Sequence, residues 1–311
     1  MNQHFRLEPA AEAVPTPVAP DELPVPPPLT HRTLPAGSRL FDLGQLEVRW
    51  DGPAGALWTW MTPNDRPNFN RAILRDFEVW QEEIHREFGH SEAGLKYLVL
   101  GSRFPKVWNL GGDLDLFSSF IMAGDRAGLV RYGRDCVAML YNHMRPDSPA
   151  VTIALVQGDA LGGGFEAMLS FNVVVAEKGA RFGLPEIAFG LFPGMGAHCL
   201  LARKLGLARA EQMILSGRTY SAEEMYEMGL VHVLAEPGAG EEAARSYIQK
   251  NGRRQSGHRG IYRASGLVDP VSLEELLAVV EVWADAALSL NASDLKLMKR
   301  LVEAQSRLRD L

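Results

Sequence analysis

Three short, almost entirely apolar runs place the strongest constraint on how this chain folds. They are KYLVLG at residues 96–101, VTIALV at 151–156 and NVVVA at 172–176, and the segments between them carry helical periods. A strand that is apolar along its whole length is typical of a sheet covered on both faces, as parallel sheets are when helices cross over them. The alternation therefore predicts an α/β fold built on largely parallel sheets.

Apolar residues at helical spacing mark the segments between these strands. From Asn70 to Phe88 they recur every three or four residues, which predicts an amphipathic helix, and a helical region is also expected from Leu116 to Met144. Ahead of both, β-rich runs at 46–50 and 56–61 flank the sequence Asp-Gly-Pro-Ala-Gly. That arrangement predicts a hairpin at the start of the folded part.

Composition divides the chain into three regions. Eight of the 19 prolines fall between Pro15 and Pro35, so residues 1–39 are expected to form a proline-rich, mobile arm. Residues 40–220 hold the alternating α/β core, and residues 221–311 are predicted to be mostly helical. Two capping-box patterns, Ser221 with Glu224 and Ser272 with Glu275, predict helix starts in this last region, and the second helix is expected to reach about Leu290.

Charge and composition exclude several classes of function. The net charge of -6 and the pI near 5.8 argue against a nucleic-acid-binding surface. No apolar run approaches the roughly 18 residues of a membrane span, and the first residues lack the pattern of a secretory signal, so we expect a cytoplasmic protein that binds neither nucleic acid nor membrane. Cys136 and Cys199 have no metal-site spacing, and no metal is expected.

A glycine-rich segment, VQGDALGGGFEAMLS at residues 156–170, follows the second apolar strand. It lacks both Gly-x-Gly-x-x-Gly and Gly-Lys-Ser/Thr, so it does not indicate a nucleotide site. Glycines at a strand-to-helix turn let the backbone approach a ligand closely, and the free N–H groups of the helix start can hold an oxyanion. They can also serve only a tight turn, and this segment alone does not separate the two possibilities.

Two glutamates lie in apolar, glycine-punctuated stretches. Glu166 closes the glycine segment, and Glu186 follows in ARFGLPEIAFGLFPGMGA, far enough along the chain for a helix and a strand to intervene. Two carboxylates that converge on one apolar pocket acquire different pKa values, so that one can hold a proton while the other accepts one. Taken singly, each glutamate is also explained as a helix-dipole or capping partner.

A third segment, VWNLGGDLDLF at 107–117, also follows a strand and opens a helix. Gly111 and Gly112 could present a second backbone N–H group opposite the first. Asp113 and Asp115 could suggest a metal site, but residues two apart do not share a helix face, and no histidine accompanies them. Helix capping is the better interpretation of these two aspartates.

In their order and spacing, NLGGDLDLF, VQGDALGGGFEAMLS and FGLPEIAFGLFPGMGAHCLLARKLG resemble the crotonase superfamily of enoyl-CoA hydratases and isomerases. The resemblance covers roughly Leu46 to Leu311. It implies a spiral of ββα units followed by a helical C-terminal trimerisation region, and hence a homotrimer or a dimer of trimers. It also implies that Gly112 and Gly163 supply oxyanion N–H groups and that Glu166 and Glu186 are the acid-base carboxylates.

Longer strings, among them SRFPKVWNLGGDLDLF and NGRRQSGHRGIYRASGLVDP, resemble the diffusible signal factor synthases of the RpfF type. That resemblance implies a bifunctional enzyme that dehydrates a 3-hydroxyacyl thioester to the cis-2-enoyl form and then hydrolyses it, releasing a free fatty acid as a quorum-sensing signal. The substrate would be carried on the phosphopantetheine of an acyl carrier protein, with no other cofactor. Two alternatives remain: an enoyl-CoA hydratase or isomerase acting on coenzyme A esters, and a crotonase-like protein that binds a regulatory partner such as a sensor kinase.

An acyl chain would require an apolar slot and a carrier protein would require a docking surface. Met195, Trp283 and Leu301 are candidates for the slot, although all three could simply be core residues. Arg253 and Arg254, in a basic run within an acidic chain, are candidates for contact with an acidic carrier protein. A solvated loop explains the same arginines equally well.

Overall fold

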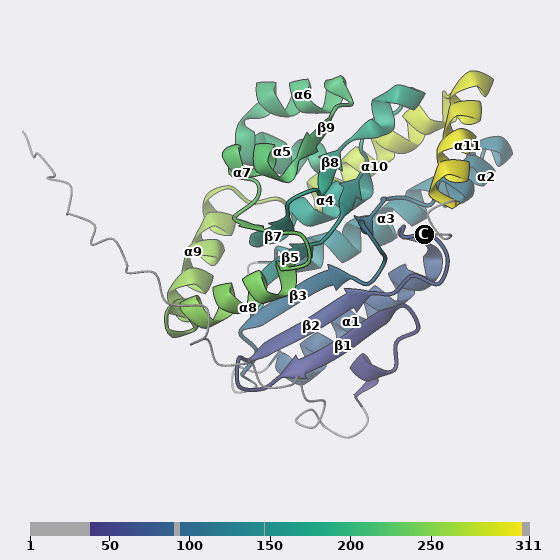
Figure 1. The fold of residues 1–311 in the computed structure, drawn as a ribbon. Helices are drawn as coiled ribbons and strands as arrows, with labels where there is room; N and C mark the ends of the chain where they lie inside the picture. The colour runs from purple at the N-terminus through teal and green to yellow at the C-terminus, as the bar shows by residue number, and fades with distance from the viewer. Residues whose placement is uncertain (1–37, 90–93, 146, 307–311) are drawn as a thin grey trace, which may run out of the picture.

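A computed structural model describes residues 38–89, 94–145 and 147–306, and the strands within these ranges form two sheets (Figure 1). The larger sheet has the order β1-β2-β3-β5-β7-β10 and the smaller has the order β4-β6-β8-β9. The strands are β1 (Leu46–Asp51), β2 (Ala56–Met61), β3 (Tyr97–Ser102), β4 (Val107–Asn109), β5 (Val151–Val156), β6 (Asp159–Leu161), β7 (Val173–Glu177), β8 (Arg181–Gly183), β9 (Thr219–Ser221) and β10 (Val233–Ala235). Nearly all of the predicted arm, residues 1–39, lies outside the described residues.

The pairing of the strands confirms the parallel sheet and the hairpin. β1 and β2 pair antiparallel, with Leu46 opposite Met61, whereas β2, β3, β5, β7 and β10 pair parallel with one another in turn. The three apolar runs are β3, β5 and β7. Every residue of these strands is buried, as expected for a sheet that is covered on both faces.

Three successive units of the chain repeat one pattern. In each unit the first strand (β3, β5 or β7) joins the larger sheet and the second (β4, β6 or β8) joins the smaller one. A helix then begins a few residues later: α2 (Leu114–Ala123), α4 (Gly163–Leu169) or the 3-10 helix η3 (Pro185–Phe189). The turns that follow β4, β6 and β8 are therefore equivalent positions in three ββα units, and parallel pairing of β4 with β6 and of β6 with β8 brings them together.

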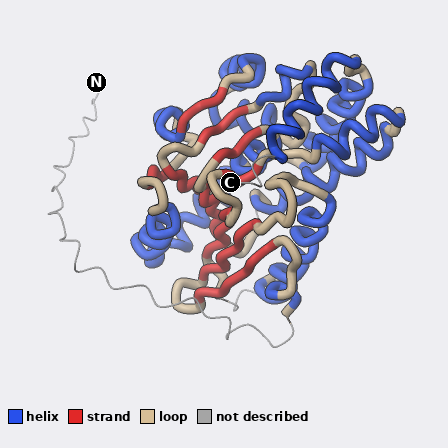
Figure 2. The backbone as a smooth tube through the Cα atoms, turned by 45° about the vertical axis from the view of Figure 1, so that its right-hand side comes forward, coloured by secondary structure: helices blue, strands red, loops and turns tan. Residues whose placement is uncertain are grey.

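Helices cover both faces of the larger sheet (Figure 2). One face packs Trp58, Val99, Ile153 and their neighbours against α8 (Gly240–Asn251). The other face packs against α1 (Arg71–Phe88) and α3 (Arg126–His143), where Trp80 donates a hydrogen bond to Thr59. The remaining helices are η2 (Arg39–Phe41), α5 (Ala197–Leu205), α6 (Leu207–Ser216), α7 (Ala222–Glu227), η4 (Gly252–Arg254), α9 (Gln255–Val268), α10 (Leu273–Leu288) and α11 (Ala292–Ser306).

The helical region expected from Leu116 to Met144 is two helices rather than one. Gly124 ends α2 in the left-handed region with φ +63°, and the side chain of Asp125 caps α3 by accepting from the amide of Gly128 at 2.8 Å. A glycine C-cap followed at once by an aspartate N-cap separates two helices sharply. Phe120 and Leu129 stay buried on either side of the break.

One predicted capping box is complete and the other is half formed. Ser221 accepts from the amide of Glu224, and Glu224 accepts from the amide of Ser221 in return. Ser272 accepts from the amide of Glu275, but the carboxylate of Glu275 instead receives two bonds from Arg203.

By length and composition no single described helix could cross a membrane; α10 and α11 pass that test only as a pair, and they are bent by 109° at the break between them.

Candidate active site

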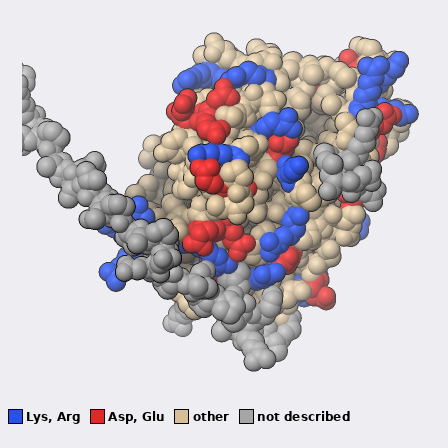
Figure 3. Space-filling view, viewed as in Figure 1, with Lys and Arg blue, Asp and Glu red and all other residues tan. Residues whose placement is uncertain are grey.

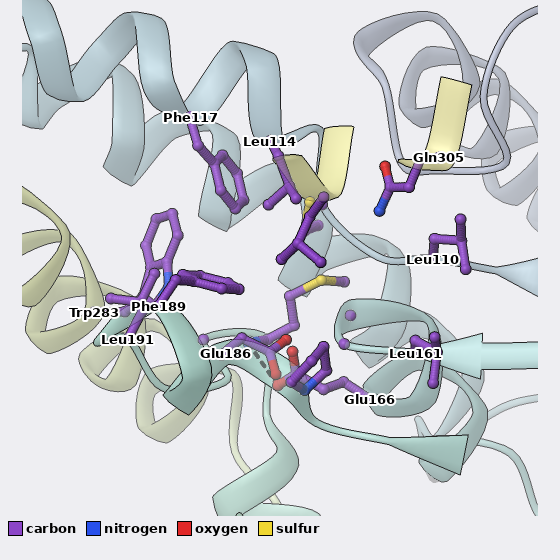
Figure 4. Close-up of a pocket in the computed structure, with 18 of the residues that line it drawn as sticks. Leu110, Leu114, Phe117, Leu161, Glu166, Glu186, Phe189, Leu191, Trp283 and Gln305 are labelled. Carbon is purple, nitrogen blue, oxygen red and sulfur yellow. Dashed lines mark hydrogen bonds between the residues drawn. The ribbon is translucent and has the colours of Figure 1, made fainter. Parts of the chain in front are cut away.

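A cavity of about 330 Å³ lies where the turns of the three ββα units meet helices α3, α10 and α11 (Figure 4). Most of its lining is apolar, whereas the two predicted glutamates and the two predicted glycines supply polar groups. The lining includes Leu110, Gly112, Leu114, Phe117, Tyr132, Leu161, Gly163, Glu166, Glu186, Phe189, Leu191, Met195, Trp283 and Leu301. An apolar cavity with a few convergent polar groups is the usual form of a small-molecule site.

Glu166 lies in the first turn of α4 and is 1% exposed. Its Oε1 atom accepts hydrogen bonds from the backbone N–H groups of Met195 and Ala197, at 2.8 and 2.9 Å. Burial raises the pKa of Glu166 to about 7, while these backbone donors act in the opposite direction because they favour the charged form. The loop before α5 therefore holds the glutamate in place, and the pKa of its carboxyl group lies near neutral pH.

Glu186 lies on η3 beside Glu166 (Figure 4). Its Oε2 atom is buried and finds no hydrogen-bond partner among the described residues. Burial, followed by the negative charge of Glu166, raises the pKa of Glu186 to about 8. The two carboxylates therefore sit in different environments: Glu166 has backbone donors that stabilise its charge, and Glu186 lacks them at Oε2.

The turn before α4 leaves backbone donors free. Gly162 has φ +53° and ψ -131°, a conformation that essentially only glycine adopts, and no side chain caps the helix. Within the described part of the chain the amide of Gly163 has no acceptor. A Cβ added to Gly163 would lie 2.5 Å from Sδ of Met195 and 3.5 Å from the amide nitrogen of Gly112. The bare backbone of Gly163 therefore faces Met195 and Gly112 at close range.

The turn after β4 supplies a second free amide. The amides of Leu110 and Gly111 donate to the carbonyl of Pro67 and to Oδ1 of Asn109, both at 2.7 Å, and the amide of Asp113 donates to the hydroxyl of Tyr132 at 3.0 Å. Among the described residues no acceptor is found for the amide of Gly112. Of these four successive amides, that of Gly112 remains available, and Gly112 lines the cavity.

The three residues predicted for an acyl slot, Met195, Trp283 and Leu301, all line this cavity. Trp283 packs edge-on against Phe117, with ring centroids 4.9 Å apart, and covers Gly194 so closely that a Cβ there would lie 2.5 Å from the indole. Leu301 belongs to α11, so the last described helix closes one wall. These side chains form an apolar region beside the carboxylates.

Arg253 and Arg254 lie outside this cavity. Both are exposed and belong to η4, between α8 and α9. Figure 1 places α8 and α9 on the opposite side of the view from α2 and α11, which flank the cavity. On the face shown in Figure 3, basic and acidic side chains alternate, and neither sign forms a continuous field. Docking through these arginines stays a prediction.

The two aspartates after Gly112 have structural partners. Asp113 is the N-cap of α2 and accepts from the amide of Leu116 at 3.3 Å. Both carboxylates also contact Arg66, at 3.6 Å for Asp113 and 2.8 Å for Asp115. The prediction of helix capping is confirmed for Asp113, whereas Asp115 lies in the first turn of α2 and pairs with Arg66.

Sequence patterns missed several residues that line the cavity. Tyr132 contributes a buried hydroxyl, Gln305 contributes an amide from α11, and Arg181 pairs with Asp159, with Nε and Oδ1 3.1 Å apart. Tyr132 and Gln305 lie outside the glycine-rich segments and reach the cavity through tertiary packing. Asp159 and Arg181 lie within the glycine-punctuated segments that the sequence singled out, but nothing in the pattern marked them as cavity residues.

Comparison with known proteins identifies the class of fold. A family model described as "Enoyl-CoA hydratase/isomerase" matches residues 88–258, which is more than half of the chain. The peroxisomal fatty acid beta-oxidation multifunctional protein AIM1 of Arabidopsis thaliana is 36% identical over 128 residues, covering 41% of this chain and 17% of that protein. The chain thus spans less than a fifth of the length of this relative.

Two solved structures share the architecture. Pseudomonas aeruginosa DspI superposes with a TM-score of 0.59 at 27% identity, over 71% of this chain and 86% of that chain. Enoyl-CoA hydratase from Bacillus halodurans superposes with a TM-score of 0.66 at 20% identity, over 86% of this chain and 100% of that chain. These likenesses, together with the family match, confirm the predicted α/β class with a helical C-terminal region.

Proposed function

The chain belongs to the enoyl-CoA hydratase/isomerase family, and from this premise we propose that it adds water to, or removes water from, the Cα–Cβ bond of a fatty-acyl thioester. One observation carries the proposal: the buried carboxylate of Glu166 and the half-buried carboxylate of Glu186, unequally hydrogen-bonded, line an apolar cavity together with two unpaired backbone amides. Double-bond migration by itself needs one group to move a proton between carbons. Adding or removing water uses two such groups, one that moves a proton at carbon and one that moves a proton at oxygen. The presence of two carboxylates therefore favours hydratase chemistry.

The two environments support the following division of roles between the carboxylates in dehydration. Glu166, whose charge is stabilised by the amides of Met195 and Ala197, is the base that removes the Cα proton. Glu186, whose Oε2 atom finds no donor among the described residues to stabilise its charge, is the acid that protonates the departing 3-hydroxyl group. The Cα–H electron pair forms the new double bond as the C–O bond breaks, and water leaves. Hydration is the reverse sequence.

The amides of Gly112 and Gly163 would stabilise the intermediate. Removal of the Cα proton places negative charge on the thioester oxygen, and two backbone donors that have no other acceptor can receive it without reorganising. Loss of one such donor typically costs about 3 to 4 kcal/mol of transition-state stabilisation. The apolar region around Trp283 and Leu301 would take the acyl chain.

The experiment is turnover of 3-hydroxyacyl and trans-2-enoyl coenzyme A esters by the purified protein, followed by mass spectrometry. Glu166→Gln and Glu186→Gln should each lower kcat by roughly 100- to 10,000-fold while the fold is retained. Glu177→Gln is the matched control, because Glu177 is also buried and also accepts from two backbone amides, those of Gly238 and Gly240, but lies outside the cavity. Substantial turnover by either active-site variant contradicts the proposal.

The second candidate is release of a free cis-2-unsaturated acid from an acyl carrier protein, by dehydration and then thioester hydrolysis. It is supported by the longer motif strings given above and by the layout of the cavity, since a water activated by a glutamate could attack a carbonyl held by the same two amides. Incubation with 3-hydroxyacyl carrier proteins distinguishes the candidates. A free acid with cis geometry supports synthesis of a diffusible signal, and an unhydrolysed enoyl thioester supports the hydratase.

Two further features remain proposals. A homotrimer, or a dimer of trimers, follows from the family resemblance, and helix α9 offers a surface for it because Ile261, Leu267 and Val268 are exposed there. Light scattering of the purified protein measures that state directly. Absence of turnover on every thioester, combined with retention of a sensor-kinase partner in a pull-down, would instead favour the regulatory binding protein.

A further inference from the structure

The hydroxyl group of Tyr132 joins two separate segments of backbone beside the cavity. It donates a hydrogen bond to the carbonyl of Phe69 at 2.5 Å and accepts one from the amide of Asp113 at 3.0 Å. Tyr132 comes from the first half of α3 and is 3% exposed. The bond to Phe69 is buried and the bond from Asp113 is partly buried, so losing the hydroxyl leaves backbone polar groups unpaired away from bulk water.

Of the two peptide planes that meet at Gly112, the Tyr132 hydroxyl bonds directly to the second, through the amide of Asp113, and is linked to the first only through the backbone of Phe69. In a trans peptide the N–H and C=O groups point in opposite directions, so fixing the carbonyl of Gly111 also fixes the direction of the Gly112 amide. That carbonyl accepts from the amide of Phe69 at 2.8 Å, and Phe69 is the residue whose own carbonyl receives the Tyr132 hydroxyl. The following plane is held through the amide of Asp113.

We propose that Tyr132 is a positioning residue for the oxyanion site, whose hydroxyl fixes the direction in which the Gly112 amide points into the cavity. The inference rests on the proposed function, in which that amide binds the thioester oxygen. Tyr132 acts on the reaction through Gly112 and need not touch the substrate.

The hydroxyl group cannot also serve as a proton donor to substrate. A tyrosine has one O–H donor, and the carbonyl of Phe69 already takes it. Burial raises the pKa of Tyr132 well above its ordinary value, so the group stays protonated and keeps that bond. Its contribution is therefore geometric.

The ring of Tyr132 supports the same loop by packing, which makes phenylalanine an informative substitution. The ring meets that of Phe117 edge-on at 5.1 Å, and Phe117 lies so close to Gly112 that a Cβ there would be 2.4 Å from its Cζ atom. Tyr132→Phe keeps this stack and removes only the hydroxyl. Tyr141→Phe, the same deletion on the same helix at a residue outside the cavity lining, is the matched control.

Two measurements test the inference in the full-length protein. In Tyr132→Phe, hydrogen exchange of the peptide spanning residues 107–117 should be faster than in wild type, and kcat should fall roughly 10- to 100-fold with KM changed less than about threefold, a smaller loss than outright removal of an oxyanion donor. Tyr141→Phe should change neither. Unchanged hydrogen exchange in residues 107–117 would overturn the inference. Values of kcat and KM in Tyr132→Phe that equal those of Tyr141→Phe would overturn it as well.

A spectroscopic arm separates this inference from the proposed function. An infrared spectrum of a bound saturated acyl coenzyme A ester, which has neither a double bond to hydrate nor a 3-hydroxyl group to lose, reports the carbonyl stretch, which shifts to lower frequency when backbone amides polarise the oxygen. If wild type turns over no thioester, the proposed function fails; a carbonyl shift that is present in wild type and reduced in Tyr132→Phe then still supports the positioning role. Equal shifts in both proteins would contradict it.

Discussion

The carboxylate of Glu186 packs against the bare Cα of Gly162: a Cβ placed there would lie 2.7 Å from Oε1 of Glu186. Gly162 also has a positive φ, which strains any residue that carries a side chain. One glycine thus makes the turn into α4 possible and leaves room for the carboxylate of the next ββα unit.

Gly162→Ala should therefore displace Glu186 and lower kcat at least tenfold, in addition to destabilising the protein by about 1 to 3 kcal/mol of backbone strain. Gly179→Ala is the control, since Gly179 also has positive φ but a Cβ there meets no atom within 4 Å. Steady-state kinetics and thermal unfolding of both variants provide the comparison. Equal activity losses in the two variants would show that strain alone is responsible.

The pH dependence of dehydration should be bell-shaped with a maximum near neutrality. The base must be ionised and the acid protonated, and burial raises the pKa of Glu166 to about 7 and that of Glu186 to about 8. The two limbs of kcat/KM against pH belong to the pair because the groups interact. An optimum below pH 5, where ordinary glutamates titrate, would contradict a shared buried site.

Stability should fall as pH rises from about 5 to 8. Both glutamates have folded-state pKa values above the ordinary value of 4.5, so over this range the folded protein holds more protons than the unfolded chain. The free energy of unfolding then decreases with pH, by up to about 1.4 kcal/mol per pH unit for each group. Glu186→Gln should flatten this dependence in denaturant titrations, and parallel curves for variant and wild type would refute it.

Trp283→Phe should shift preference toward longer acyl chains. The indole closes part of the apolar region against Phe117 and Gly194, and a smaller ring leaves space there. The test is kcat/KM over a series of chain lengths, with Trp80→Phe as a control because Trp80 is buried outside this cavity. An unchanged profile in Trp283→Phe would place the acyl chain elsewhere.

Reversal of charge at Arg253 and Arg254 tests docking of a carrier protein. If an acidic carrier binds η4, the double variant Arg253→Glu with Arg254→Glu should lose several-fold more turnover on carrier-bound substrate than on coenzyme A esters, and added salt should reduce the difference. Arg75→Glu with Arg209→Glu, a double reversal at two exposed positions outside the cavity, controls for net charge. Equal losses on the two substrates would exclude a docking role.

The sequence predicted the elements that follow local rules. The strand at 151–156 has the predicted bounds, and the hairpin, the Ser221 capping box and the parallel pairing were all confirmed. These features depend on residue periodicity and on side chains that bond within a few positions. The short strands β4, β6, β8 and β9 had no such signal, because three residues are too few to show a period.

The residues of the site divide in the same way. Gly112, Gly163, Glu166 and Glu186 lie in glycine-punctuated motifs, and the fold brings all four to one cavity. Tyr132 has no sequence signal because its partners, Phe69 and Asp113, are distant along the chain and its own surroundings show only an ordinary amphipathic helix. The second capping box was predicted from local spacing, but the carboxylate of Glu275 binds Arg203 instead. Arg203 is a tertiary partner that no local rule could supply.

Helix α11 has a consequence for how the protein is made. It supplies Leu301, Ala304 and Gln305 to the cavity and is the last described element of the chain. Because the chain is synthesised from its N-terminus, both glutamates and both glycine amides are made long before helix α11, which covers them. A nascent chain leaves these groups open to water until α11 has emerged from the ribosome and packed against them, so the site closes later than its reactive groups are made.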